Sequence, residues 1–120
     1  MDERRRHSFG DARFTTTVAH DGRGSIEVAR ATTDVPGSAC TFIDLCVLPS
    51  GSSIGLHAHG VDDEEIYVVI DGHGSMTVDD ETFEVGPGDV IVNRPGGTHG
   101  LANGTDAPLR IVVVDIAMPD

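Results

Sequence analysis

The sequence predicts an all-β fold, either a sandwich or a barrel. Short runs rich in Val, Ile and Thr alternate with turn signals rich in Gly, Pro, Asn and Asp, and no interval shows an apolar pattern at helical spacing. Many short strands separated by turns of this kind are typical of sandwiches and barrels. The strand-like runs are SIEVARATT at 25–33, TFIDLCVL at 41–48, EIYVVI at 65–70, SMTV at 75–78, TFEV at 82–85, DVIVN at 89–93 and LRIVVVDI at 109–116.

The length predicts one domain. A chain of 120 residues is long enough for one hydrophobic core and too short for two. The sequence has no internal repeat and no low-complexity linker that would mark a second domain. We therefore expect a flexible N-terminal tail over residues 1–12 and a single domain over residues 13–120.

The charge balance excludes two classes of partner. The formal net charge is −12, with 20 acidic residues against 8 Lys and Arg, and such a field repels nucleic acid and anionic membranes. The chain has no apolar run of the roughly 18 residues that would predict a membrane span, and its first residues lack the apolar segment of a secretory signal. We therefore expect a cytoplasmic protein without a nucleic-acid or membrane partner.

Two cysteines, Cys40 and Cys46, lie in the run CTFIDLC. If that run is a strand, the two residues are roughly 20 Å apart. A disulfide needs Cα atoms within about 7 Å, so this pair cannot form one. Free thiols fit the expected cytoplasmic location.

Two histidines, His57 and His59, lie one residue apart and precede an acidic run that enters an apolar strand. Residues two apart in a strand share a face, so these imidazoles point the same way, as do Glu65 and Tyr67 further on. Together with His99 they offer three imidazoles and a carboxylate, which are ligands that a borderline divalent metal ion prefers. The alternative is chance, because the chain has six histidines and an acidic run such as DDEE is often a solvated turn.

Two glycine-anchored motifs extend this pattern. The first runs Gly51, five residues, His57-Ala58-His59, a five-residue gap, Glu65, six residues and Gly72; the second runs Gly88, five residues, Arg94-Pro95-Gly96, two residues, His99, three residues and Asn103. With these motifs the chain resembles the cupin family over residues 51–103.

The resemblance implies a fold, a cofactor and a class of function. The fold would be a single jelly-roll β-barrel, and one divalent ion (Fe, Mn, Ni, Zn or Co) would be held by His57, His59, Glu65 and His99. The function would be that of a metal-dependent enzyme acting on a small polar molecule by oxidation, isomerisation, cyclisation or elimination. The alternative is a non-catalytic cupin that binds or senses a small ligand. A homodimer is also expected.

The motifs depart from the family pattern at two places. The gap after His59 is one residue longer than usual, so either Glu64 or Glu65 is the ligand; we favour Glu65 because it keeps the six-residue distance to Gly72. Arg94 stands where the family usually has Pro. Its planar guanidinium suits a substrate carboxylate, which makes it a candidate catalytic residue, although a solvent-facing loop arginine is an equal alternative.

Two further residues have open roles. Tyr67 is either a catalytic proton donor or substrate anchor, or a core aromatic residue. Asp44 lies mid-strand, and it is a general base if its face points inward and without significance if it points outward. The other histidines are expected at the surface: His7, His20 and His73.

Overall fold

The computed structural model describes residues 5–58 and 60–119, so the predicted ligand His59 lies outside the described residues. Within these ranges the chain forms ten strands: β1 (Thr15–Thr17), β2 (Ile26–Ala31), β3 (Cys40–Leu48), β4 (Ser53–Ala58), β5 (Asp63–Asp71), β6 (Gly74–Val78), β7 (Glu81–Val85), β8 (Val90–Asn93), β9 (Thr98–Ala102) and β10 (Leu109–Ala117).

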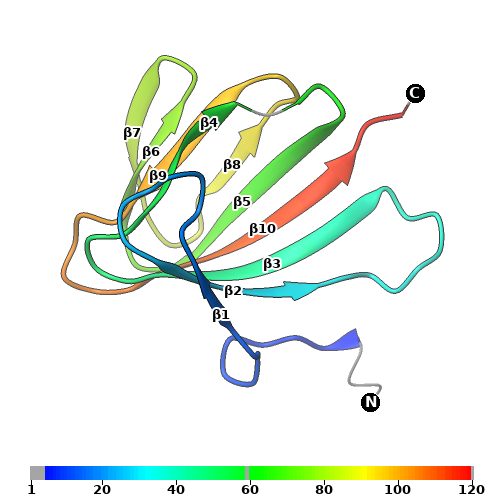
Figure 1. Ribbon diagram of the computed structural model, residues 1–120, viewed down its shortest axis with the longest axis horizontal. Coiled ribbons are helices and arrows are strands. Elements are labelled where there is room, and N and C mark those ends of the chain that lie inside the picture. The colour runs from blue at the N-terminus through cyan, green and yellow to red at the C-terminus, as the bar shows by residue number, and fades with distance from the viewer. Residues whose placement is uncertain (1–4, 59, 120) are drawn as a thin grey trace.

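The strands form two antiparallel sheets (Figure 1). The larger sheet has the order β1-β2-β3-β10-β5-β8, and the smaller has the order β4-β9-β6-β7. β10 lies between β3 and β5, and β9 lies between β4 and β6, so the chain crosses repeatedly from one sheet to the other. The all-β prediction is confirmed, and this interleaved order is consistent with a jelly roll.

No α-helix occurs in the part of the chain that the structure describes. The described residues therefore contain no helix long and apolar enough to cross a membrane.

The core lies between the two sheets and follows the period-two alternation of their strands. In β5, Tyr67 and Val69 are 2% and 1% exposed, and in β10 the side chains of Leu109, Ile111 and Val113 are buried in the same cluster. Residues two apart share a face, so the parity predicted for Glu65, Tyr67 and Val69 sets the inner face of β5.

Gly72 shows why the motif glycines stand where they do. Its φ is +88°, a conformation that side chains with a Cβ rarely adopt. A Cβ at this position would also lie 2.3 Å from the Pro108 carbonyl oxygen. The turn after β5 therefore requires glycine, and it fixes where β5 ends relative to the site.

Asn103 secures the connection between β9 and β10. Its Nδ2 donates to the carbonyl oxygens of Leu48 and Ala107, each at 2.8 Å, and its Oδ1 accepts from the Thr105 backbone N–H and hydroxyl. The residue is 1% exposed. Every polar atom of this buried side chain therefore has a partner.

Both cysteines are free, as predicted. Cys46 belongs to the core and is 4% exposed. Burial raises the pKa of its thiol to about 12, and the nearby Asp44 carboxylate contributes to the rise. Cys46 is therefore a protonated core residue at neutral pH.

The segment before β1 contains a turn in which the Ala12 N–H donates to the Ser8 carbonyl oxygen at 3.0 Å. The Phe9 ring stacks on Phe14 with 6.2 Å between centroids. The domain boundary at residue 12 stays a prediction.

Candidate metal site

One row of side chains crosses the inner face of the larger sheet. The strand register pairs Phe42 of β3 with Asp115 of β10, Asp115 with Glu65 of β5, and Glu65 with Asn93 of β8. Directly opposed residues have Cβ atoms about 4.5–5.5 Å apart. Asp115 and Asn93 are 4% and 2% exposed, so Asp115, Glu65 and Asn93 form a largely buried polar band at the end of the hydrophobic core.

Two histidines face this row from the smaller sheet. His57 of β4 and His99 of β9 are register partners, and their rings meet edge to face with 4.4 Å between centroids. His99 is 1% exposed. β4 and β9 therefore hold two imidazoles side by side, opposite Glu65.

The ligand atoms of His57, Glu65 and His99 all lie within 4.8 Å of one another. His99 Nε2 lies 3.3 Å from Glu65 Oε1. Two ligands of one ion, each at about 2.0–2.2 Å from it, are about 2.8–3.6 Å apart at octahedral or tetrahedral angles. The measured separation fits a shared divalent ion.

A hydrogen bond also fixes the tautomer of His57. Its Nδ1 lies 2.7 Å from the Gly55 carbonyl oxygen, which can only accept, so Nδ1 carries the proton. The lone pair is then on Nε2, as metal coordination requires, and a carbonyl partner on the other ring nitrogen is typical of metal-binding histidines.

The fold and this donor set agree with a comparison against protein families. The model of the cupin domain matches residues 44–115. The chain belongs to the cupin family.

Three similar proteins illustrate the range of this cupin's relatives. An oxalate-binding protein of Thermotoga maritima is 28% identical over 98 residues, which cover 81% of this chain and 80% of that protein. An uncharacterised protein of Methanocaldococcus jannaschii is 42% identical over 66 residues, and these span only about half of that protein, 52% of its length. The crystal structure of a predicted oxalate decarboxylase from Thermotoga maritima superposes with a TM-score of 0.86 at 24% identity, covering 92% of this cupin and 97% of that chain.

The structure brings Glu65 of the cupin motif to the histidines, while Glu64 lies elsewhere. β5 begins at Asp63, so the two glutamates point to opposite sides of the strand. Glu64 is paired in register with Ile116 and belongs to neither group of potential metal ligands among the described residues. The extra residue of the gap is absorbed in the turn before β5.

Tyr67 lies two residues after Glu65 in β5, on the same face of the strand. Its ring meets His99 edge to face with 5.3 Å between centroids. Burial raises the pKa of Tyr67 well above its usual value, and the Glu65 carboxylate adds to the rise. The phenol therefore keeps its proton at neutral pH, and its role as proton donor or anchor stays a prediction.

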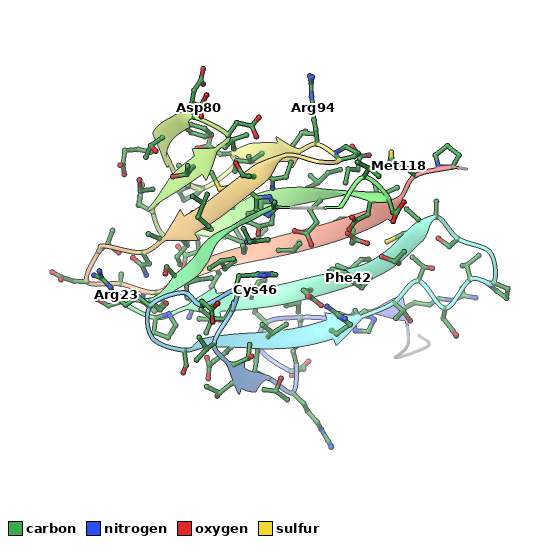
Figure 2. All side chains as sticks on the ribbon, turned by 45° about the horizontal axis from the view of Figure 1, so that its top comes forward. Arg23, Phe42, Cys46, Asp80, Arg94 and Met118 are labelled. Atoms are coloured by element: carbon green, nitrogen blue, oxygen red, sulfur yellow. The ribbon has the colours of Figure 1, made fainter. Side chains whose placement is uncertain are left out.

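Arg94 is exposed and points away from the sheets into solvent (Figure 2).

Asp44 is buried on the inner face of β3, where Arg30 donates two hydrogen bonds to it, of 2.9 and 3.0 Å. Donating to Asp44 raises the pKa of Arg30, whose guanidinium also lies 3.9 Å from the Phe42 ring centroid. Asp44 is thus one half of an ion pair.

Sequence reasoning missed several groups that surround the site. Asp63, Glu65 and Asp115 form a carboxylate cluster with ligand atoms within 4.8 Å of one another. Burial raises the pKa of Asp115 to about 6; the neighbouring Asp63 carboxyl raises it further and the Thr41 hydroxyl opposes the rise. The alternation of LRIVVVDI places Asp115 on the inward face with Ile111 and Val113, so strand parity alone would have found it.

His20 was expected at the surface, and its side chain is exposed. It nevertheless stacks on His57, with 3.4 Å between ring centroids and 6° between planes. The approach depends on glycine, because a Cβ at Gly55 would lie 2.1 Å from the His20 carbonyl oxygen. No pattern in the sequence connects these two residues, which are brought together by the loop between β1 and β2.

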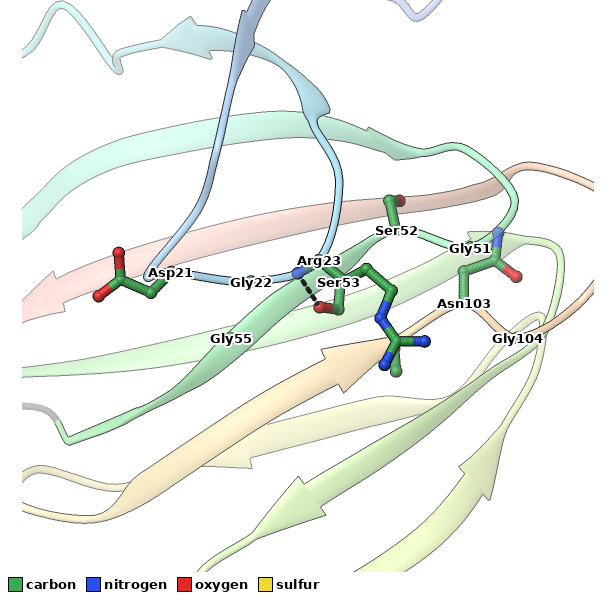
Figure 3. Close-up of a pocket in the computed structure, with 10 residues that line it drawn as sticks. Asp21, Gly22, Arg23, Gly51, Ser52, Ser53, Gly55, Asn103 and Gly104 are labelled. Carbon is green, nitrogen blue, oxygen red and sulfur yellow. Dashed lines mark hydrogen bonds between the residues drawn. The ribbon is translucent and has the colours of Figure 1, made fainter.

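The loop between β1 and β2 also borders a hollow of about 620 Å³ beside β4 (Figure 3). There the Arg23 N–H donates to Ser53 Oγ at 2.8 Å. Among the described residues, the lining contains none of His57, Glu65 and His99. The cluster of His57, Glu65 and His99 is therefore the better candidate site.

Proposed function

We propose that this cupin holds one divalent metal ion through His57, His59, Glu65 and His99 and acts as an enzyme on a small oxygen-rich acid that binds to the ion. The observation that supports this proposal most strongly is the convergence of the His57, Glu65 and His99 ligand atoms within 4.8 Å. His59 is included because the motif places it two residues after His57. The two sheets would then be the halves of one jelly-roll barrel around the ion.

The charge of the donor set favours an anionic ligand. Neutral imidazoles and one carboxylate leave a divalent ion with a net charge of about +1. An ion that prefers six ligands and takes four from the protein would have two positions left for the oxygens of an acid. When bound, the ion supplies a Lewis acid that fixes and polarises the ligand's oxygens.

The oxalate class is suggested by relatives of this cupin. One is an oxalate-binding protein, and a structural neighbour is a predicted oxalate decarboxylase. With a formal net charge of −12, the chain as a whole repels anions, so affinity for such an acid depends on the ion and its immediate surroundings.

A catalytic role is supported by two side chains, Asp115 and Tyr67, that can hold a proton near the proposed metal-bound acid. The pKa of Asp115 is raised to about 6 by burial, close to the pH at which general acids and bases are most effective. Tyr67 contacts the His99 ring and stays a neutral phenol. These residues would hold or deliver a proton on the inner face of the larger sheet.

The second candidate is non-catalytic binding of the same acid, and the 28% identity to the oxalate-binding protein favours it. Both candidates predict that the metal-loaded protein binds oxalate and that the metal-free protein does not. Only the enzyme converts it.

The deciding experiment is metal analysis of protein purified without added metal, followed by calorimetry with oxalate and assays of oxygen uptake and of carbon dioxide and formate release. Turnover would support the enzyme, and tight binding without turnover would support the binding protein. Failure of oxalate to bind the loaded protein would contradict both. The catalytic role of Arg94, the homodimer and the cytoplasmic location stay predictions.

A further inference from the structure

Asn93 is a buried side chain whose amide has no partner in the described part of the chain. It is the last residue of β8 and is 2% exposed. Neither its Nδ2 nor its Oδ1 makes a hydrogen bond with any described residue. A buried amide without partners lowers stability, and an apolar side chain of similar shape would not. The strand would accept such a residue, because the preceding inward position holds Ile91 in the core.

Asn103 is a second buried asparagine with which the side-chain amide of Asn93 can be compared directly. It is equally buried, yet both of its side-chain polar atoms have partners, as described above. The fold therefore satisfies a buried asparagine where that residue has a structural task. The unpaired amide of Asn93 calls for a different explanation.

The position of Asn93 suggests what its amide is for. Asn93 is paired in register with the candidate ligand Glu65, which places the two side chains next to each other on the inner face. It also borders a cavity of about 170 Å³ whose lining includes His99. Asn93 is thus next to one candidate metal ligand, Glu65, and shares the lining of a cavity with another, His99.

We propose that Asn93 positions the metal-bound acid by donating a hydrogen bond from Nδ2 to a ligand oxygen. This inference rests on the proposed function. The bound acid would then turn one oxygen toward the end of β8, where Asn93 lies.

The test uses Asn93→Leu, with Asn103→Leu as the matched control. Three quantities are measured: the urea midpoint of the metal-free protein, the Mn²⁺ affinity, and the oxalate affinity of the Mn²⁺-loaded protein by calorimetry. We expect Asn93→Leu to keep or raise the midpoint, to leave Mn²⁺ affinity within about threefold, and to weaken oxalate binding about 10- to 100-fold. Asn103→Leu should lower the midpoint or fail to fold.

Several outcomes would overturn the proposal. A midpoint that falls as it does in the control would make Asn93 a structural residue. A loss of Mn²⁺ affinity would mean that its amide orients a metal ligand. Unchanged oxalate binding, in this variant or in Asn93→Asp, which replaces the donor by an acceptor of the same shape, would remove Asn93 from the ligand site.

The same data separate this inference from the proposed function. If the wild-type protein binds Mn²⁺ but no oxalate, the proposed ligand class is wrong and the role of Asn93 is refuted with it. If wild type and Asn93→Leu bind oxalate equally, the proposed function stands and the role of Asn93 alone is refuted.

Discussion

Replacing Asp115 by Asn should stabilise the metal-free protein at neutral pH. The carboxyl group is 4% exposed, it accepts a hydrogen bond from the Thr41 hydroxyl, and it lies among the carboxylates of Asp63 and Glu65. Asparagine has the same shape and keeps an acceptor for Thr41. The substitution therefore removes a buried charge and little else.

The magnitude follows from the pKa of Asp115, which burial raises from 3.8 to about 6. A rise of about two units corresponds to roughly 3 kcal/mol at most. The folded chain binds the proton more tightly than the unfolded chain, so the penalty is fully present above pH 6 and disappears as the pH falls through 6 toward 3.8. We expect Asp115→Asn to raise the free energy of unfolding by about 1–3 kcal/mol at pH 7.5 and by little near pH 4.

The assay is urea unfolding of chelator-treated protein at pH 7.5, 6.0 and 4.5. Asp71→Asn is the control, because Asp71 is exposed and pairs with Arg110 at 3.0 Å; its effect should stay within about 1 kcal/mol and be destabilising. Two results would contradict a destabilising charge on Asp115. One is a lower free energy of unfolding for Asp115→Asn than for wild type at pH 7.5, and the other is a difference between the two that does not change with pH.

Three other predictions concern the site and the core. Glu65→Gln should weaken Mn²⁺ binding at least about tenfold, while Glu64→Gln should change stability by no more than about 0.5 kcal/mol; the reverse pattern in a metal titration would contradict the assigned register. Disulfide-exchange labelling at pH 8 should modify Cys40 and spare Cys46, whose pKa is raised to about 12; equal labelling of both would contradict its burial. Gly72→Ala should lower the free energy of unfolding by about 1–3 kcal/mol, and an unchanged urea midpoint would contradict the strained turn.

The regular strands were predictable because a buried face imposes a period of two. EIYVVI and LRIVVVDI correspond to β5 and β10, and the parity of β5 selects Glu65 over Glu64. β1, β4 and β9 were not among the predicted runs. β1 is three exposed threonines, β4 is interrupted by Gly55, and β9 has Gly100 at its centre.

The site was predictable only where the motif spacing names its residues. The spacing places His57, Glu65 and His99 together, and the structure agrees. Asn93 and His20 could not be found in this way, because their proximity depends on strand register and on a loop packed across β4. Register and loop packing are tertiary properties that a single sequence does not display.

The proposed binding of a metal ion by His57, His59 and His99 is tested most directly by the metal content of dialysed protein. The wild-type chain should retain about one divalent ion, and His73→Ala, a control outside the described clusters of potential ligands, should retain the same amount. The double variant His57→Ala, His59→Ala should retain almost none, because the remaining imidazole and carboxylate cannot complete a site. Stoichiometric metal in the double variant would contradict the site described here.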